Sequence, residues 1–195
     1  MTRPRTRDHR NTAARTTLSR IAWIMMLEDG LDAVTPGSVA ARADLTTRTF
    51  RYHFRNREEA IPDELDQQRQ AMVARIRSRP PGEPLWDCLL HTLPAAVVEM
   101  TQNRDAFASL IRMIDADPQT RVEAMLMRDR AQRSLIRIVS ERTDTDHRTD
   151  PYPGLLGGAL TVTLHLSIVQ WATGATETLL PELIRSCLLM LRAGL

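Results

Sequence analysis

The chain has 195 residues, a net charge of +2 and a hydrophobic fraction of 43%, enough for one domain with a sizeable core or for a small module joined to a larger one. Its two cysteines, Cys88 and Cys187, lie far apart and no CxxC or Cys/His ligand spacing is present, which argues against a disulfide scaffold and against a structural metal. No apolar signal segment follows the polar N-terminus, so we expect a reduced, cytoplasmic protein without a cofactor.

The charge is unevenly distributed along the chain. Residues 1–57 contain eleven Arg and five acidic residues, a net charge of +6, whereas the remainder contains 15 Arg and 19 acids, a net charge of −4. A basic head on an acidic body indicates that the head meets a polyanion. A chance cluster of solvated arginines is the alternative.

Every predicted element is a helix, because no segment alternates apolar and polar residues as a half-buried strand does. The first helix ends at Gly30, and its apolar face is formed by Leu18, Ile21, Ala22 and Met25. Thr35-Pro36 begins a second, short helix, since Thr caps free N–H groups and Pro suits the first helical position. That helix ends near Asp44, a residue type that tolerates left-handed backbone.

A third helix begins after the capping residue Thr46 and runs through about His53, with Phe50 and Phe54 on its buried side. Its other side presents the hydroxyl, guanidinium and phenol groups of Thr46, Thr47, Arg48, Arg51 and Tyr52. Such groups bond phosphate oxygens and base edges. Two short helices joined by a tight turn in an Arg-rich segment predict a helix-turn-helix that inserts this face into the major groove of double-stranded DNA.

The rest of the chain predicts six more helices. Asn56 and Glu59 have the spacing of a capping box for a helix over 57–78, which Pro62 is expected to bend or delay. Breaks at 77–84, Asp117-Pro118 and 143–154 separate the helices that follow. The segment 154–172 nears membrane-spanning length, but its polar residues and glycines favour a soluble helix buried on most sides. A final helix spans 179–192.

Residues 14–57 resemble the DNA-binding domain of the TetR-family transcriptional regulators. The first helix matches the family at the family's spacing, with Leu18, Ile21-Ala22, Met25-Met26, Glu28 and Gly30. "AVTPGSVAARADLTTRTFRYHFRNREEA" then follows the family's small helix, turn, recognition helix and closing aromatic-x-His-Phe. Asp44 departs from the Gly that is common in the turn, and Arg51 stands where Tyr is common. The match covers about a quarter of the chain.

The resemblance implies an all-α fold with an N-terminal arm and helix-turn-helix domain over residues 1–57, followed by a helical ligand-binding and dimerisation domain over 58–195. It implies DNA contacts by Thr35, Thr46, Thr47, Arg48, Arg51, Tyr52, His53 and Arg57. Arg48 would approach the bases, and Arg51 would replace the usual Tyr on a phosphate. His53 would bond a phosphate or only pack in the turn. A flexible arm would be formed by Arg3, Arg5, Arg7 and Arg10. This arm would either enter a minor groove or remain a solvated tail.

The resemblance also implies a homodimer through residues 154–192, in which Leu164 and Leu188 are expected at the interface; a helix in the monomer core is the alternative. Candidate residues for a small-molecule pocket are Trp86, His91, Met100, Phe107, Arg112, Met113 and Met125, each of which has an ordinary place in the core as its alternative. "RPPGEPLWDCL" and "LLMLRAGL" are similar to a branch that senses acyl-CoA-like ligands. Arginines of the helix that follows Pro118 would then meet CoA phosphates or form a solvated face.

These observations predict a ligand-responsive transcriptional regulator, a repressor that a small apolar molecule releases from a palindromic operator. We expect no enzymatic activity, because the sequence has no GxSxG elbow, P-loop or HExxH motif. The alternative is a helical enzyme or a lipid-binding carrier without specific DNA binding. A carrier leaves the basic head unexplained, and duplex binding that weakens with salt separates the two readings.

Overall fold

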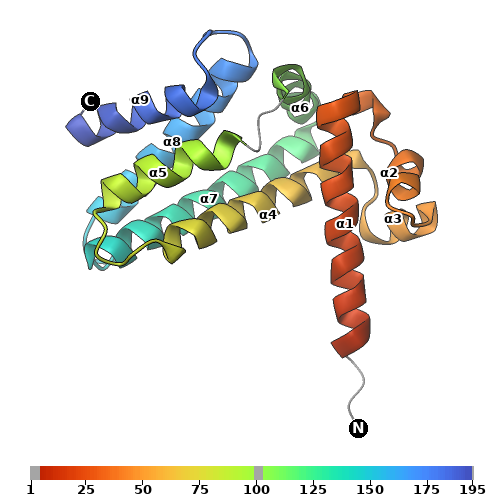
Figure 1. The fold of residues 1–195 in the computed structure, drawn as a ribbon, viewed down its shortest axis with the longest axis horizontal. Helices are drawn as coiled ribbons and strands as arrows, with labels where there is room; N and C mark the ends of the chain where they lie inside the picture. Colours follow the sequence, from red (N-terminus) through yellow and green to blue (C-terminus); the bar gives the residue numbers. More distant parts are fainter. Residues whose placement is uncertain (1–4, 99–102, 195) are drawn as a thin grey trace.

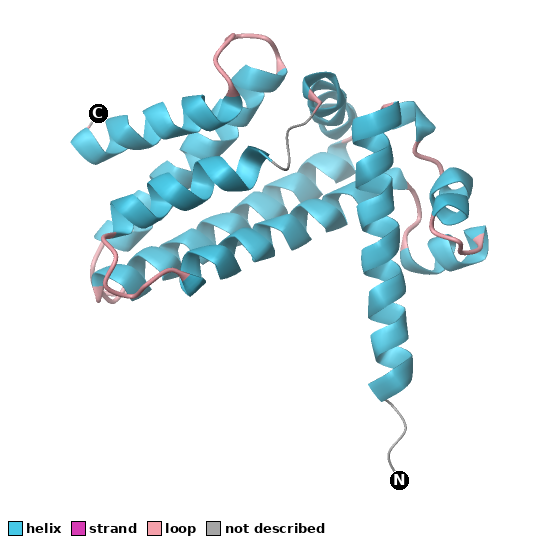
Figure 2. Cartoon of the chain, viewed as in Figure 1, coloured by secondary structure: helices cyan, strands magenta, loops and turns pink. Residues whose placement is uncertain are grey.

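The computed structural model describes residues 5–98 and 103–194, and every regular element within these ranges is helical (Figure 2). A head made of α1 to α3 adjoins a larger body made of α4 to α9, and α1 runs across the end of α4 and projects beyond the body (Figure 1). The predicted all-α class and the order of the helices are therefore confirmed.

The head contains α1 (Arg5–Asp29), a 3-10 turn η1 (Leu31–Ala33), α2 (Pro36–Arg42) and α3 (Thr47–His53). Its core is formed by side chains from all three helices that are at most 7% exposed, namely Leu18, Ala22, Met25, Met26, Val39, Ala40 and Phe50. The chain is already helical from Arg5, so residues 5–10 do not form the flexible arm that was expected. Arg3 lies outside the described residues.

The body contains α4 (Arg57–Ser78), α5 (Leu85–Val98), α6 (Arg104–Ala116), α7 (Pro118–Thr143), α8 (Tyr152–Ala172) and α9 (Leu180–Ala193). α7 packs mainly on α8, α5 packs mainly on α9, and α4 touches both α1 and α7. The buried apolar residues of head and body form one continuous cluster. Because α4 contacts the head at one end and the body along its length, it is the mechanical link between them.

Pro62 does not delay the start of α4. The helix begins at Arg57, where the Asn56 side chain accepts a hydrogen bond from Glu59 N at 3.2 Å, and it continues without interruption to Ser78. Pro62 stands in the second turn, where its missing N–H removes only one early backbone hydrogen bond. The prediction of a delayed start is therefore wrong.

The apolar helix α8 has one buried face and one exposed face. It is long and apolar enough to cross a membrane by length and composition alone, yet 44% of its most apolar window is buried inside the protein. It approaches α7 closely at Gly157, where a Cβ atom would lie 2.6 Å from Cγ1 of Ile136. The opposite face exposes Leu155, Val162 and Leu166.

Leu164 and Leu188 do not lie on that exposed face. Leu188 of α9 is 0% exposed, and Leu164 of α8 is partly buried against the same core. Leu188 therefore belongs to the packing within one chain. The expectation that Leu188 forms an interface between chains is therefore wrong, whereas the interface role of Leu164 stays a prediction.

Candidate nucleic-acid interface

The start of α2 is fixed by a reciprocal pair of hydrogen bonds. Ser38 N donates to Thr35 Oγ1 at 3.1 Å, and Thr35 N donates to Ser38 Oγ at 3.0 Å. Pro36 follows at the first helical position, as the sequence predicts. The Ser38 hydroxyl also donates to Ala33 O at 2.7 Å, which ties α2 to the 3-10 turn before it. The Thr35 hydroxyl is therefore a capping group, and its residue remains exposed at the surface.

The turn between α2 and α3 depends on Asp44, whose φ of +53° lies in the left-handed region. Asp44 N donates to Ala41 O at 3.2 Å and Leu45 N donates to Ala40 O at 2.9 Å, so the free carbonyls at the end of α2 are satisfied. Gly is the residue that usually allows this conformation, and Asp is one of the few others that adopts it readily. The turn predicted at Asp44 is confirmed.

The third helix is capped by Thr46, whose side chain accepts a hydrogen bond from Thr49 N at 3.1 Å. Phe50 and Phe54 are 0% and 1% exposed, and their ring centroids lie 5.7 Å apart. These two aromatic side chains hold α3 against α1. Burial of Phe50 and Phe54 turns the opposite face of the helix outward, as predicted from the spacing of these residues.

The outward face of α3 carries groups that suit nucleic acid. Thr47, Arg48, Arg51 and Tyr52 are all exposed, and Tyr52 is 72% exposed. Neither Arg48 nor Arg51 makes a hydrogen bond or an ion pair with any described residue, whereas Arg42 binds Glu28 with 2.5 Å between Nη2 and Oε2. Two guanidiniums without an internal counter-ion on a short, exposed helix are free to bind phosphates or guanine edges.

Arg57, unlike Arg48 and Arg51, faces inward and is not exposed for contact with nucleic acid. Its Nη1 donates to Leu31 O at 2.7 Å and approaches Asp32 Oδ1 at 3.4 Å, and its Nε donates to Glu58. Only 28% of its side chain is exposed. The guanidinium therefore fastens the start of α4 to η1, and the expectation that Arg57 binds a phosphate does not agree with this geometry.

His53 lies at the end of α3 between the exposed and buried faces. Its ring meets the Tyr52 ring edge to face, with centroids 5.0 Å apart, and its carbonyl accepts a hydrogen bond from Arg15 at 3.2 Å. Burial, and next the neighbouring Arg15 guanidinium, lower the pKa of His53, while Asp63 opposes this shift. His53 therefore packs in the turn as a neutral ring, and its remaining exposed edge is available to a phosphate.

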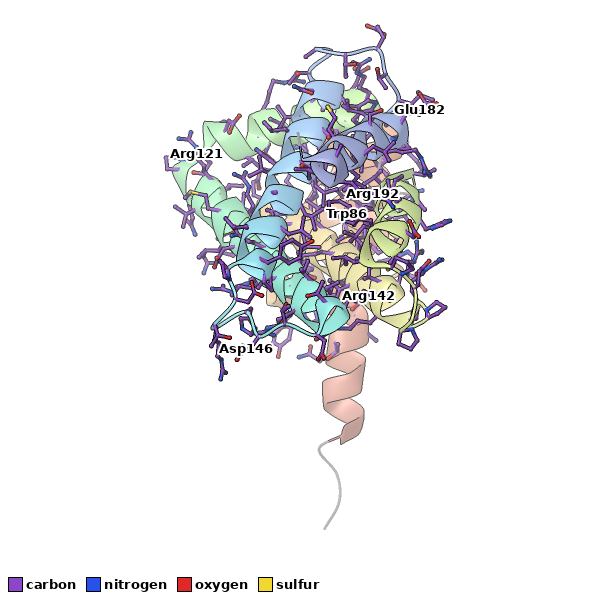
Figure 3. The ribbon with its side chains drawn as sticks, turned by 90° about the vertical axis from the view of Figure 1, so that its left-hand side faces the viewer. Trp86, Arg121, Arg142, Asp146, Glu182 and Arg192 are labelled. Carbon is purple, nitrogen blue, oxygen red and sulfur yellow. The ribbon has the colours of Figure 1, made fainter. Side chains whose placement is uncertain are left out.

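The residues proposed for a ligand pocket lie in different surroundings. Phe107 is buried between Trp23 and Trp171, whereas His91 and Met125 are mostly exposed on different helices. Trp86 is partly buried against the core. Figure 3 shows Trp86 well away from Arg121, one of the arginines suggested for CoA phosphates.

Arg112 and Met113 of the proposed set border one cavity, a space of about 670 Å³ that is also bordered by Asp29 and Arg57. Met100 lies outside the described residues. The sequence placed the other candidates by their types and their helical spacing, which do not fix the direction of a side chain relative to distant helices. The grouping of the seven residues in one pocket stays a prediction.

A second cavity was missed by the sequence analysis. It has a volume of about 630 Å³ and lies between α1, α4 and the end of α5. Polar residues of α4, namely Glu64, Gln67 and Gln68, form one of its walls. A signal was present in the sequence, because this polar group stands within the helix that links head and body, where apolar residues are expected.

Comparison with solved structures identifies the fold. The chain superposes on Thermus thermophilus FadR, a TetR-family transcriptional repressor in complex with lauroyl-CoA, with a TM-score of 0.68 and 19% identity over 93% of this chain and 94% of that one. A putative TetR-family regulator from Mesorhizobium loti gives a TM-score of 0.65 at 16% identity, with 94% and 96% covered. A regulator of the same kind from Aquifex aeolicus gives 0.61 at 14% identity, with 93% and 99% covered.

The chain thus has the TetR fold over nearly its whole length. No protein-family model matches the sequence, and no curated protein shows significant similarity to it. The predicted resemblance, an N-terminal helix-turn-helix domain followed by a helical body, is confirmed at the level of the fold.

Proposed function

We propose that the chain is a DNA-binding transcriptional regulator that acts as a homodimer and responds to a small ligand. One observation carries the proposal: the outward face of α3 presents Arg48 and Arg51, neither of them paired with a counter-ion among the described residues, on a helix-turn-helix scaffold. The fold supports it, because the structures that share this fold over nearly the whole chain are TetR-family regulators. We retain a division into a DNA-binding domain over residues 1–57 and a ligand-binding and dimerisation domain over 58–195.

In this proposal α3 enters the major groove. Arg48 reaches base edges. The phosphates are contacted by Thr47, Arg51 and Tyr52, and the cap residues Thr35 and Thr46 lie close to them. Exposed α3 residues can make these contacts without any change in the core, because Phe50 and Phe54 hold the helix from the other side. Arg57 takes no direct part and instead stabilises the segment before α2.

The proposed dimer forms through the exposed faces of α8 and α9. α8 exposes Leu155 at 72%, Val162 at 55% and Leu166 at 51%, and α9 exposes Leu189 at 48% and Met190 at 51%. Single exposed apolar residues are ordinary, but an aligned group on two neighbouring helices is typical of an interface. Pairing of these faces with those of a second copy would produce a four-helix interface and two α3 helices related by a two-fold axis.

The ligand is proposed only as a class. The lauroyl-CoA bound by T. thermophilus FadR supports an acyl-CoA-like molecule as the first candidate for a protein of the same fold. The arginines of α7 do not add to this support. Arg133 is paired with Asp129 at 2.5 Å, and Arg121 donates to the Asp115 carbonyl, as expected of a solvated charged face.

Binding to duplex DNA at increasing salt tests the proposal. A regulator should bind selected fragments in a way that weakens steeply with salt, because phosphate contacts release counter-ions. A helical carrier or enzyme of the same fold should show no selection among sequences. Arg48→Ala and Arg51→Ala should weaken binding, while Arg137→Ala on α7, an exposed arginine away from the head, should leave it unchanged.

A further inference from the structure

Two different helices of the body hold α1 at two places along its length. Arg15 and Ser19 meet α4, where Asp63 accepts from Arg15 at 2.6 Å and Ser19 accepts a side-chain hydrogen bond at 2.9 Å. Trp23 and Leu27 continue the same four-residue ridge of α1 and meet α6 instead. At 1.5 Å per residue, the two outer attachments lie about 18 Å apart. A helix held at two such points has a fixed angle, whereas a single attachment would leave it free to swing.

Asn103 attaches the start of α6 to the end of α1. Its Oδ1 accepts a hydrogen bond from Ala106 N at 3.1 Å and so caps α6, while its Nδ2 donates to Leu27 O at 2.6 Å. Leu27 lies in the last turn of α1, where backbone carbonyls lack a partner within the helix. One short side chain therefore fixes the beginning of α6 and the end of α1 against each other.

The next residue, Arg104, attaches α6 to the turn between α8 and α9. Its Nε donates to Trp171 O at 2.5 Å, and its Nη2 donates to Thr176 O at 2.6 Å. Its Nη1 also approaches Glu177 Oε2 at 3.9 Å, but that side chain is 96% exposed, so the ion pair adds little. The two carbonyls belong to the last turn of α8 and to the segment before α9. The guanidinium therefore bridges the turn that joins these helices.

Phe107, one turn later in α6, makes a third connection between the same elements. It is 3% exposed and lies between Trp23 of α1 and Trp171 of α8. The ring centroids are 5.4 Å and 5.9 Å from that of Phe107, with interplanar angles of 82° and 67°. Edge-to-face ring pairs of this kind are favourable and directional. Polar and aromatic contacts of α6 thus both join the end of α1 to the end of α8, and Figure 1 shows α6 between α1 and the turn after α8.

We propose that the start of α6 (103–107) is a strut that sets the angle between head and body in addition to α4, with Asn103, Arg104 and Phe107 as positioning residues for DNA binding. They act through the position of α3 and need no contact with DNA. In the proposed dimer the strut connects each head to the helices of the interface, so it fixes the separation of the two α3 helices. This consequence for DNA rests on the proposed function, whereas the strut itself belongs to one chain.

The strut is tested without DNA by the distance between two spin labels on the full-length chain. The labels replace Ala41 of α2 and Glu182 of α9, both exposed, in a chain whose two native cysteines are changed to alanine. Dilution with unlabelled chain restricts the measurement to distances within one chain. Arg104→Gln removes the bonds to the turn, and Asn103→Asp keeps the cap but loses the donor to Leu27 O. Both variants should widen the narrow distance distribution expected of the labelled parent.

Arg112→Gln is the matched control, because Arg112 is exposed on the same helix and donates to Ser109 of that helix. This variant should leave the distance distribution unchanged. Distributions as narrow as that of the parent in both Arg104→Gln and Asn103→Asp would overturn the strut. Equal widening by Arg112→Gln would overturn it too, because any lost arginine on α6 would then have the same effect.

The spacing of the operator half-sites tests the consequence for DNA. One base pair inserted between them moves and rotates one half-site, so the wild type and Arg112→Gln should lose about tenfold or more in affinity. Arg104→Gln should lose less than about threefold, because a loosely held head can follow the displaced half-site. A mere loss of stability would weaken binding to both duplexes alike and leave the preference intact, which would overturn the positioning role. A wild type that binds no duplex would refute the proposed function and leave the spin-label result unaffected.

Discussion

Arg15 of α1 and Asp63 of α4 are joined by two hydrogen bonds to one carboxylate oxygen, at 3.0 Å from Nε and 2.6 Å from Nη2. The same guanidinium donates to the carbonyl of His53 and lies 4.5 Å above the Phe54 ring. One side chain of α1 thus holds the end of α3 and the start of α4 together. Because 45% of the Arg15 side chain is exposed, we expect it to set the orientation of α3 more than the stability of the fold.

Replacing Asp63 separates this positioning role from a simple charge effect. Asp63→Asn removes a negative charge near the head, so a charge effect alone would tighten DNA binding. Loss of the Arg15 anchor should instead weaken operator binding severalfold, as should Arg15→Gln. The measurement is a titration of a labelled operator with each variant. Arg20→Gln is the matched control for Arg15→Gln, because both variants lose one positive charge from α1. Tighter operator binding by Asp63→Asn would refute the positioning role.

Arg48 and Arg51 should have different effects on DNA binding. Arg48→Ala should cost roughly 1–3 kcal/mol on the operator and little on random DNA, because it reads a base. Arg51→Ala should weaken all sequences alike and reduce the salt slope by about 1, because it contacts a phosphate. The affinities of both variants for operator and random duplexes, measured at several salt concentrations, distinguish a base contact from a phosphate contact. Equal losses on both kinds of DNA for Arg48→Ala would make Arg48 a phosphate contact.

The proposed dimer interface can be tested without disturbing the core. Leu166→Glu places a charge on the exposed face of α8 and should give a folded monomer with weak operator binding. Leu188→Glu is the contrasting variant, since it buries a charge in the core and should unfold the chain. Sedimentation and circular dichroism distinguish the outcomes. A wild type that sediments as a monomer at micromolar concentration would rule out this dimer.

Arg142 stabilises the junction of α4 and α5. At the end of α7 (Figure 3), its guanidinium donates to four backbone carbonyls, those of Ile76, Arg79, Pro80 and Glu83, at 2.7 to 3.4 Å. These include carbonyls left free at the end of α4. Arg142→Ala should lower the free energy of unfolding by about 2–3 kcal/mol, because several acceptors lose a charged donor. Arg137→Ala on the same helix should change it by less than about 0.5 kcal/mol in urea unfolding.

The pH dependence of DNA binding should report on His53. Its pKa is lowered by burial and by Arg15, with Asp63 acting against this, so the ring is neutral at neutral pH. A bound phosphate favours the protonated ring, so operator affinity should rise as pH falls through the lowered pKa. Stability of the free protein should change in the opposite direction, since a base with a lowered pKa loses its contribution as pH falls. If His53→Gln shows the same pH profile as the wild type, His53 only packs in the turn.

Local chemistry made most of the fold predictable. Thr35, Thr46 and Asn56 each cap the helix that their sequence context indicates, and Asp44 takes the left-handed conformation expected of it. Such features depend on a few neighbouring residues, which the sequence shows directly. The outward face of α3 was predictable for the same reason, since the positions of Phe50 and Phe54 determine it.

Side-chain direction relative to distant elements was not predictable in this way. The inward turn of Arg57 depends on the carbonyl of Leu31, 26 positions earlier in the chain. The cavity at Glu64 is formed by three helices whose crossing no local pattern indicates. Leu188 was expected at an interface because its helix carries many apolar residues, and only the packing within the chain decides which of them are covered.

The central claim is that the outward face of α3 recognises duplex DNA, and selection of genomic fragments by the wild type and by the Arg48→Ala/Arg51→Ala double variant tests it most directly. The account predicts that the wild type enriches fragments sharing a near-palindrome. The logarithm of its binding constant for these fragments should fall linearly with the logarithm of the salt concentration. The double variant should melt at the wild-type temperature, because both side chains are exposed and neither forms a hydrogen bond or an ion pair with a described residue, and it should enrich no sequence. Failure of the wild type to bind any duplex, or the same enrichment by the double variant, would contradict the account.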